Sequence, residues 1–441
     1  MRRIAWMALI LMIPGPLRAD LLVFAQGGRV QLPATVRGDR VELATPDGPK
    51  TFARSDFQSI TPGHDPAAEW PAMRERALQG DAAARFEAAW WALENGLTPE
   101  AVAMLDASRA DGAGHPPTRR ALAMLDALRA PCPPADLGPV REALRPGRFE
   151  VLEGEHVVLL HQLDAATARE RLDVAERVVM TFCLTLAAQG LPVATPSRRL
   201  ISVCFADRGE YAGFLRRAEA SGFADTQGFY HPTLRAVFAF DARGGEDQKT
   251  RRRALANRAR EGAPASEIDR LTLLLELDRR AIDLGILAHE TVHQLAVATG
   301  IEPRPDAFPT WLHEGLAAQF EVVRGGRWAG VGRVNDLRLP DWRAIRPAPR
   351  LAPLLRDAGL GQGYRRDLYA ESWALVYFLR KTRPDAFRAY LDLLRAPGSG
   401  ADRHASAFRS AFGPDLAGLE TAWHRYLAEL RTPWESDSTP R

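Results

Sequence analysis

The sequence predicts an α+β protein on the strength of three observations. Residues 21–62 alternate apolar and polar side chains in short runs, which is typical of strands. Residues 66–130 are rich in Ala, Leu, Glu and Arg and favour helices. From residue 149 onward, strand and helix patterns alternate ahead of one long apolar helix, and more helices follow. We therefore expect an all-β domain, a helical segment and a mixed domain, in that order.

The first 19 residues predict a secretory signal peptide. The positive pair Arg2-Arg3 precedes an apolar run over residues 4–13, and Ala19 offers a small residue for cleavage. Ten apolar residues are too few to cross a bilayer, and no Cys follows to accept a lipid. We expect an exported protein, periplasmic or extracellular, without a membrane span. The alternative is a buried N-terminal helix.

Cysteine usage is sparse for a chain of 441 residues, with only Cys132, Cys183 and Cys204. Export would permit a Cys183–Cys204 disulfide, but their helical and strand surroundings favour two buried free thiols. None of the three lies in a nucleophile motif, and no G-x-S-x-G occurs. The sequence therefore favours neither a cysteine nor a serine hydrolase.

Three segments precede the mixed domain. Residues 20–62 predict a small β domain of SH3-like size, and residues 131–147 begin with a stiff Pro-rich linker. Residues 66–130 resemble one or two tetratricopeptide-like hairpins, with Trp90, Trp91 and Leu105 as interior residues. Because the repeat signature is incomplete, a helical spacer is at least as well supported as a module that binds a protein partner.

Residues 148–431 predict the mixed domain. Strands are expected at 149–152, 156–161, 200–206 and 234–240, helices at 165–188 and 211–220, and C-terminal helices at 367–381, 384–395, 402–411 and 415–431. The basic stretch within 241–278 is followed by acidic residues, and the whole chain carries a net charge of only +3. A solvated helical insertion is therefore favoured over a nucleic-acid site.

The motif that carries chemistry is His289-Glu290-Thr291-Val292-His293, in an apolar helix expected from about Asp278 to Thr299. A rotation of about 100° per residue places His293 about 40° from His289, with Glu290 beside them. Two neutral imidazoles one turn apart can hold one metal ion while the carboxylate acts as a general base for water. The alternative is a core helix with two hydrogen-bonded histidines.

A catalytic zinc site needs a third protein ligand and one open position. Residues 311–320, Trp-Leu-His-Glu-Gly-Leu-Ala-Ala-Gln-Phe, predict a second helix that follows Pro309 and has Thr310 as its N-cap. Glu314 lies in the first turns of this helix and would complete a His₂Glu site.

HETVH followed at this spacing by WLHEGLAA resembles the gluzincin metallopeptidases. The resemblance implies a zincin-like fold, Zn²⁺ held by His289, His293 and Glu314, and Glu290 as the base. It also implies an edge strand that pairs with substrate beside the metal, for which Leu234–Phe240 is our candidate. Residues 149–430 further resemble a bacterial family of predicted gluzincins of unassigned function. The local matches are Gly228-Phe229-Tyr230, Tyr369-Ala370-Glu371-Ser372-Trp373, Ala411-Phe412-Gly413, Trp423 and Tyr426.

A tetrahedral oxyanion usually gains from one more hydrogen-bond donor. Several gluzincins use a Tyr or His from the C-terminal helices, and the resemblance makes Tyr369 the first candidate and Tyr230 the second. A buried Tyr369 bonded to backbone is the alternative. His231 and His404 are expected at the surface or as capping residues, and His313 is expected to point away from the metal.

One position departs from the thermolysin-type pattern. An acidic residue four positions after the ligand Glu orients a ligand His there, but here that position is Ala318. Asp283 and Asp306 are the candidates for this carboxylate.

The expected function is thus an exported zinc peptidase that acts on peptides or proteins, with an endopeptidase favoured over an exopeptidase. Two alternatives stay open: a non-catalytic, zinc-stabilised scaffold that binds partners, and a zinc amidase that acts on cell-wall peptides. A structural zinc site needs no base, so Glu290 counts against the scaffold.

Overall fold

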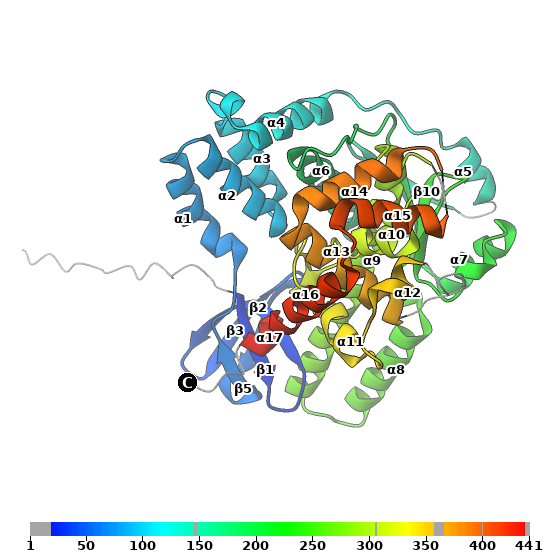
Figure 1. The fold of residues 1–441 in the computed structure, drawn as a ribbon. Helices are drawn as coiled ribbons and strands as arrows, with labels where there is room; N and C mark the ends of the chain where they lie inside the picture. The colour runs from blue at the N-terminus through cyan, green and yellow to red at the C-terminus, as the bar shows by residue number, and fades with distance from the viewer. Residues whose placement is uncertain (1–18, 145–147, 305–306, 357–365, 399, 437–441) are drawn as a thin grey trace, which may run out of the picture.

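A computed structural model describes residues 19–144, 148–304, 307–356, 366–398 and 400–436 (Figure 1). The protein is α+β, as predicted, and begins with an all-β region that is followed by helices and a mixed sheet. The predicted signal peptide lies outside the described residues except for Ala19, which begins the first strand. None of the described helices is long and apolar enough to cross a membrane.

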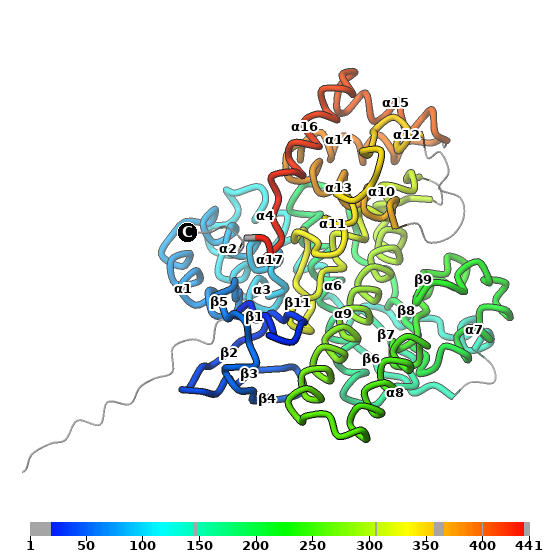
Figure 2. Tube along the Cα trace, turned by 90° about the horizontal axis from the view of Figure 1, so that it is seen from below, coloured from blue at the N-terminus to red at the C-terminus, as the bar shows by residue number. Residues whose placement is uncertain are grey.

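The N-terminal region is an antiparallel sheet of five strands in the order β4-β3-β2-β1-β5. The strands are β1 (Ala19–Phe24), β2 (Arg29–Arg37), β3 (Arg40–Thr45), β4 (Gly48–Ala53) and β5 (Phe57–Thr61). The aromatic rings of Phe24, Phe52 and Phe57 contact one another at the centre of its core. Leu273 of a distant helix completes this core. The sheet is therefore packed against the mixed domain (Figure 2).

The helical segment consists of α1 (Pro66–Leu78), α2 (Ala82–Glu94), α3 (Thr98–Ala107) and α4 (Pro116–Arg129). It shares one continuous core with the long helix α6 (Ala165–Ala188) of the mixed domain. The hydroxyls of Thr98 and Thr181 lie 3.1 Å apart across this interface. Leu105 is buried as expected, but Trp90 and Trp91 are only half-buried. The segment is therefore packed on the mixed domain.

The mixed sheet has the strand order β6-β7-β8-β10-β9. The strands are β6 (Glu150–Glu153), β7 (Val157–His161), β8 (Leu200–Phe205), β9 (Gly228–His231) and β10 (Ala236–Phe240). β7, β8 and β10 run parallel, and the two outer strands are antiparallel to their neighbours. Alternate side chains pack on α7 (Arg208–Arg217) on one face and on α6 on the other. The three central strands are thus apolar on both faces.

The expectation that Leu234–Phe240 forms the edge strand is wrong. β10 lies inside the sheet, between β8 and β9, and its residues are buried. The edge on this side of the sheet is β9, which contains Gly228-Phe229-Tyr230 and pairs with β10. The periodicity of a strand cannot predict its position in the sheet. Whether a strand lies at the edge or inside depends on which other strands pair with it in the folded protein.

α9 (Ala265–Ala298) is longer than expected and runs through the centre of the molecule (Figure 2). It ends where predicted, ahead of Gly300 with its left-handed backbone. Its first half pairs with α8 (Glu246–Arg260), and the two helices form the predicted insertion. Arg251 bonds Asp278 at 3.0 Å and Arg258 bonds Glu267 at 2.7 Å. Most basic groups of α8 therefore have acidic partners, as in a solvated helix of mixed charge.

The C-terminal part is helical, as predicted, and covers the second half of α9 (Figure 1). Its main helices are α10 (Thr310–Ala317), α11 (Arg338–Ala344), α13 (Arg366–Thr382), α14 (Pro384–Arg395), α15 (Ala401–Phe412) and α16 (Leu416–Glu429), with the shorter elements α12 (Leu351–Leu355), α17 (Pro433–Ser436), β11 (Val323–Arg324) and β12 (Arg327–Trp328). The short helix α5 (Gly138–Ala143) precedes the mixed sheet and packs in the core on its α7 face. All three cysteines are free, so no Cys183–Cys204 disulfide forms. Burial raises the pKa of both thiols to about 12, which keeps them protonated.

Candidate metal centre

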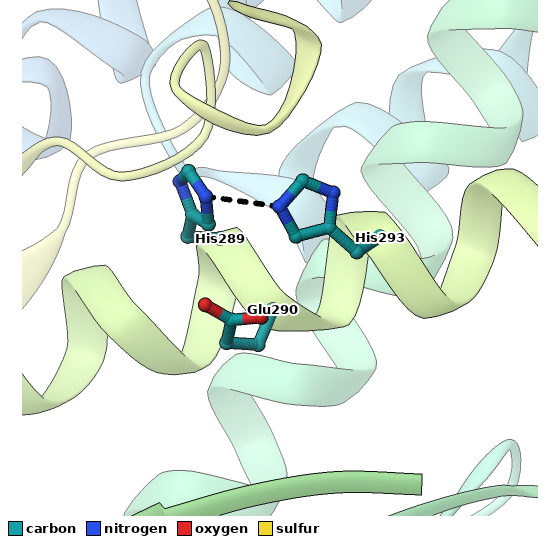
Figure 3. Close-up of side chains that lie close together, drawn as sticks. All are labelled: His289, Glu290 and His293. Atoms are coloured by element: carbon teal, nitrogen blue, oxygen red, sulfur yellow. Dashed lines mark hydrogen bonds between the residues drawn. The ribbon is translucent and has the colours of Figure 1, made fainter. Parts of the chain in front are cut away.

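His289 and His293 project from one side of α9, one turn apart (Figure 3). Their Nε2 atoms lie 3.0 Å from each other, and both side chains are buried. The flanking Ala288 and Val292 are fully buried in the core, which fixes the rotation of the helix. The apolar sequence that surrounds the motif thus determines which way the two imidazoles face.

α10 brings Glu314 to the same point. Its Oε2 lies 3.1 Å from Nε2 of His289 and 3.5 Å from Nε2 of His293. A Cβ on the next residue, Gly315, would lie 2.4 Å from the carbonyl oxygen of Ser372, so only glycine lets α10 approach α13 this closely. The helix begins at Thr310 with Pro309 as its N-cap, and the prediction of a Thr310 cap is wrong.

These three atoms have the spacing of a tetrahedral zinc site. Zinc bound at about 2.0–2.1 Å holds its ligand atoms about 3.3 Å apart. The three separations among Nε2 of His289, Nε2 of His293 and Oε2 of Glu314 are 3.0, 3.1 and 3.5 Å. The donor set of two imidazoles and one carboxylate is also one that zinc prefers. The residues present therefore fit zinc.

Glu290 lies on the adjacent face of the same turn (Figure 3). Ligand-type atoms of His289, Glu290 and His293 all lie within 4.8 Å of one another. Burial raises the pKa of Glu290 to about 7, against the opposing effects of the nearby histidines and of a hydrogen bond from the backbone N–H of Tyr230. A carboxylate with this pKa can both accept and return a proton near neutral pH.

The two imidazoles have opposite electrostatic surroundings. Burial lowers the pKa of His289, but its contacts with the carboxylates of Glu314 and Glu321 outweigh this effect and raise it to about 10. Burial and the neighbouring His313 lower the pKa of His293 to about 3. Burial opposes the ionisation of Glu314, yet the two imidazoles hold its pKa well below the usual range. The site thus favours an ionised carboxylate next to a cationic charge.

Glu321, which sequence analysis missed, supplies a carboxylate beside His289, one of the predicted ligands. Its Oε2 lies 3.3 Å from Nδ1 of His289, an ion-pair contact on the side of the ring away from Glu314. A Cβ at Gly285 would lie 2.9 Å from the carbonyl oxygen of Glu321, so this glycine of α9 admits the segment. The glycine one turn before His289 was the only signal in the sequence for this approach.

Of the two carboxylates predicted for this role, Asp283 does not take it. Asp283 bonds Arg171 and Arg279 at 2.7 and 2.8 Å, in a separate buried cluster. Asp306 lies outside the described residues. Arg338 and Asn335 hold Glu321 through bonds of 2.6 and 2.8 Å to Oε1. Burial opposes ionisation of Glu321, but Arg338 and His289 lower its pKa to about 2.

Tyr369 lies at the metal centre, on the first turn of α13. Its ring centroid is 5.9 Å from that of His289, and its side chain is half-buried. Tyr230, the second candidate, lies on β9, and burial raises the pKa of its phenol. Both tyrosines therefore flank α9 at the motif, Tyr369 from the C-terminal helices and Tyr230 from the edge strand.

Of the remaining histidines, His313 differs most from expectation. Its ring stacks on that of His293 at 4.0 Å, and its Nδ1 lies 3.0 Å from the buried carboxylate of Glu302. His313 thus supports a predicted ligand instead of pointing away from the site. His231 caps a turn, as expected, by accepting the backbone N–H of Leu234 at 3.3 Å. His404 is buried within α15, so its expected place at the surface is wrong.

Residues 283–397 match the model of a protein family described as a protein of unknown function, DUF1570. The matched stretch contains the HETVH turn, Glu314, Glu321 and Tyr369. No curated protein matches the chain.

Proposed function

We propose that this protein is an exported, zinc-dependent peptidase of the gluzincin type, with a zincin-like catalytic domain. The observation that carries the proposal is the triangle of His289, His293 and Glu314, whose edges of 3.0–3.5 Å suit a tetrahedral zinc ion. A structural site would not need the half-buried Glu290 beside this triangle, whereas hydrolysis does.

His289, His293 and Glu314 would hold the ion. When bound, zinc supplies a Lewis acid that acidifies a water molecule and polarises the substrate carbonyl. Glu290 would accept a proton from the attacking water and return it to the leaving amine. Tyr369 is the candidate donor to the oxyanion, because its ring contacts that of His289, with the two ring centroids 5.9 Å apart.

The edge strand β9 is the proposed docking site for the substrate backbone. Its outer side is not paired with any described strand, and Tyr230 of this strand donates its backbone N–H to Glu290. A peptide that extends the sheet would therefore run past the general base. This arrangement favours an endopeptidase, since an added strand can continue in both directions from the metal. The charged termini of a substrate play no part in it.

The test combines zinc content with hydrolysis of a peptide library. We expect about one zinc per chain in the wild type and a clear loss in Glu314→Ala. Glu290→Gln should keep zinc and lose about 10²–10⁴-fold in rate, because only the proton acceptor is removed.

Glu267→Gln is the matched control on the same helix, where the carboxylate only pairs with Arg258. This variant should leave both the zinc content and the rate of peptide hydrolysis unchanged. Full hydrolysis by Glu290→Gln would refute the mechanism. A wild type that binds zinc yet cleaves no peptide or cell-wall amide would favour the non-catalytic scaffold.

A further inference from the structure

Arg338, the first residue of α11, contacts both sides of the metal centre. Its Nε and Nη2 donate to the two oxygens of Glu321 at 2.6 and 3.1 Å. Its guanidinium carbon lies 5.1 Å from the ring centroid of Tyr369. Arg338 and Glu321 are both close to nine-tenths buried, so these contacts are largely shielded from water.

The first contact fixes the orientation of His289. A bidentate guanidinium holds both oxygens of a carboxylate in one plane, which a single hydrogen bond cannot do. Glu321 held in this way keeps its Oε2 3.3 Å from Nδ1 of His289. Carboxylates that contact the outer nitrogen of a ligand histidine fix its ring and its tautomer, and their loss weakens metal binding.

The second contact supports Tyr369. A guanidinium over an aromatic face attracts the ring and limits its movement. Asn335 in turn fixes Arg338, because its Oδ1 accepts the backbone N–H groups of Leu337 and Arg338 at 2.9 and 3.0 Å. The same Asn335 donates to Glu321, so the start of α11 and Glu321 form one hydrogen-bonded unit.

We propose that Arg338 is a positioning residue that sets two functional groups together, the ligand His289 through Glu321 and the candidate oxyanion donor Tyr369 through its ring. This inference rests on the proposed function. It goes beyond that function by assigning a role to a residue that contacts neither the metal nor the substrate. One side chain thereby couples the affinity for zinc to the rate of the reaction.

The test compares Arg338→Gln with Arg324→Gln. Arg324 is a similarly buried arginine that makes a bidentate pair with Asp336, at 3.3 and 3.0 Å. Among the contacts of the described residues, it reaches neither Glu321 nor Tyr369. We expect Arg338→Gln to raise the zinc dissociation constant about 10–100-fold in competition with a chromogenic chelator. It should also change the visible absorption of the Co²⁺-substituted protein. Arg324→Gln should change neither.

A third variant, Glu321→Gln, separates the two contacts. With a peptide found in the library, Arg338→Gln at saturating zinc should lower kcat further than Glu321→Gln does, because only the arginine variant also frees Tyr369. Equal kcat values would overturn the coupling to Tyr369. If Arg338→Gln does not fold, Arg338→Lys keeps the charge without the fork and should show the zinc effect in smaller measure.

A zinc affinity of Arg338→Gln or Arg338→Lys within twofold of the wild type would overturn the inference and leave the proposed function intact. So would an equal loss in Arg324→Gln, which would indicate a general effect of a broken ion pair. A wild type that takes up no zinc would overturn both proposals.

Discussion

Two buried clusters of charged side chains lie on α9 within two turns of each other, and they differ in how charge is compensated. In the first, the arginine–aspartate cluster, Arg171 and Arg279 face Asp241 and Asp283 at separations of 2.7–4.0 Å. All four side chains are at most 4% exposed. Two positive and two negative groups neutralise each other, so this cluster is complete without any ligand.

The metal centre lacks such compensation. Arg338 neutralises Glu321, but the carboxylates of Glu290 and Glu314 have only imidazoles as cationic partners. When both imidazoles are neutral, as metal binding requires, the carboxylates of Glu290 and Glu314 would leave two net negative charges, which one divalent cation would balance. Burial of charge alone therefore does not indicate a functional site. A buried cluster in which ligand atoms converge and positive charge is lacking does indicate one.

The largest expected effect comes from breaking the neutral cluster. Asp283→Ala should lower the free energy of unfolding by about 3–5 kcal/mol, because it leaves two buried guanidinium groups short of a partner. Urea denaturation measures this loss. Asp278→Asn, five residues earlier on the same helix and 43% exposed, is the control and should cost less than about 1 kcal/mol. Similar losses in the two variants would contradict the distinction that we draw.

Zinc should produce the next largest effect, by completing the second cluster. At 100 times its dissociation constant, zinc should stabilise the metal-free protein by about 2.7 kcal/mol, since only the folded chain presents the three ligands together. Thermal unfolding with and without zinc measures this gain. Mg²⁺ should have little effect, because it prefers oxygen ligands. A zinc-induced gain of the same size in Glu314→Ala would count against the His₂Glu site.

The smallest expected effect comes from the pair of the buried His156 and the partly buried Glu176, in which a proton can supply the positive charge. His156 lies 2.9 Å from both the Glu176 carboxylate and the carbonyl oxygen of Leu128. Burial lowers the pKa of His156, but these two acceptors together raise it above 6.5. The folded state thus binds the proton more tightly than the unfolded state. Its contribution to stability is complete below pH 6.5 and is lost as the pH rises through the folded pKa.

We therefore expect the free energy of unfolding to fall between pH 6 and pH 9 by about 1.5 kcal/mol more in the wild type than in His156→Gln. This is roughly the contribution of one charge-assisted hydrogen bond. Thermal unfolding at both pH values measures the difference. The control is His424→Gln, which removes a half-buried imidazole. Among the described residues, the hydrogen bond given for this imidazole is to the carbonyl oxygen of Pro349. An identical pH dependence in wild type and His156→Gln would show that the pair does not retain the proton.

The local features of this protein could be predicted from the sequence alone. The 3.6-residue period of apolar positions predicted α6 at its observed bounds, and it predicted α13, α14, α15 and α16 within two residues. The same period placed His289, Glu290 and His293 on one side of one turn. Spacing to a second helix then predicted Glu314 as their neighbour. Each inference depends on contacts within a helix or on a motif of fixed spacing, and such information is local.

Which segments meet in space became clear only from the folded structure. The edge position of β9 depends on sheet order, which an apolar strand such as β10 does not encode in its own pattern. Glu321 reaches His289 because α9 and the chain after α10 approach closely at Gly285, and Arg338 reaches Glu321 from a further helix. His313 stacks on His293 for the same reason, since α10 lies across α9. Side chains far apart in sequence acquire such roles only through packing. Helix periodicity fixes the direction of a side chain relative to the axis of its helix, but it does not fix which neighbour the side chain meets.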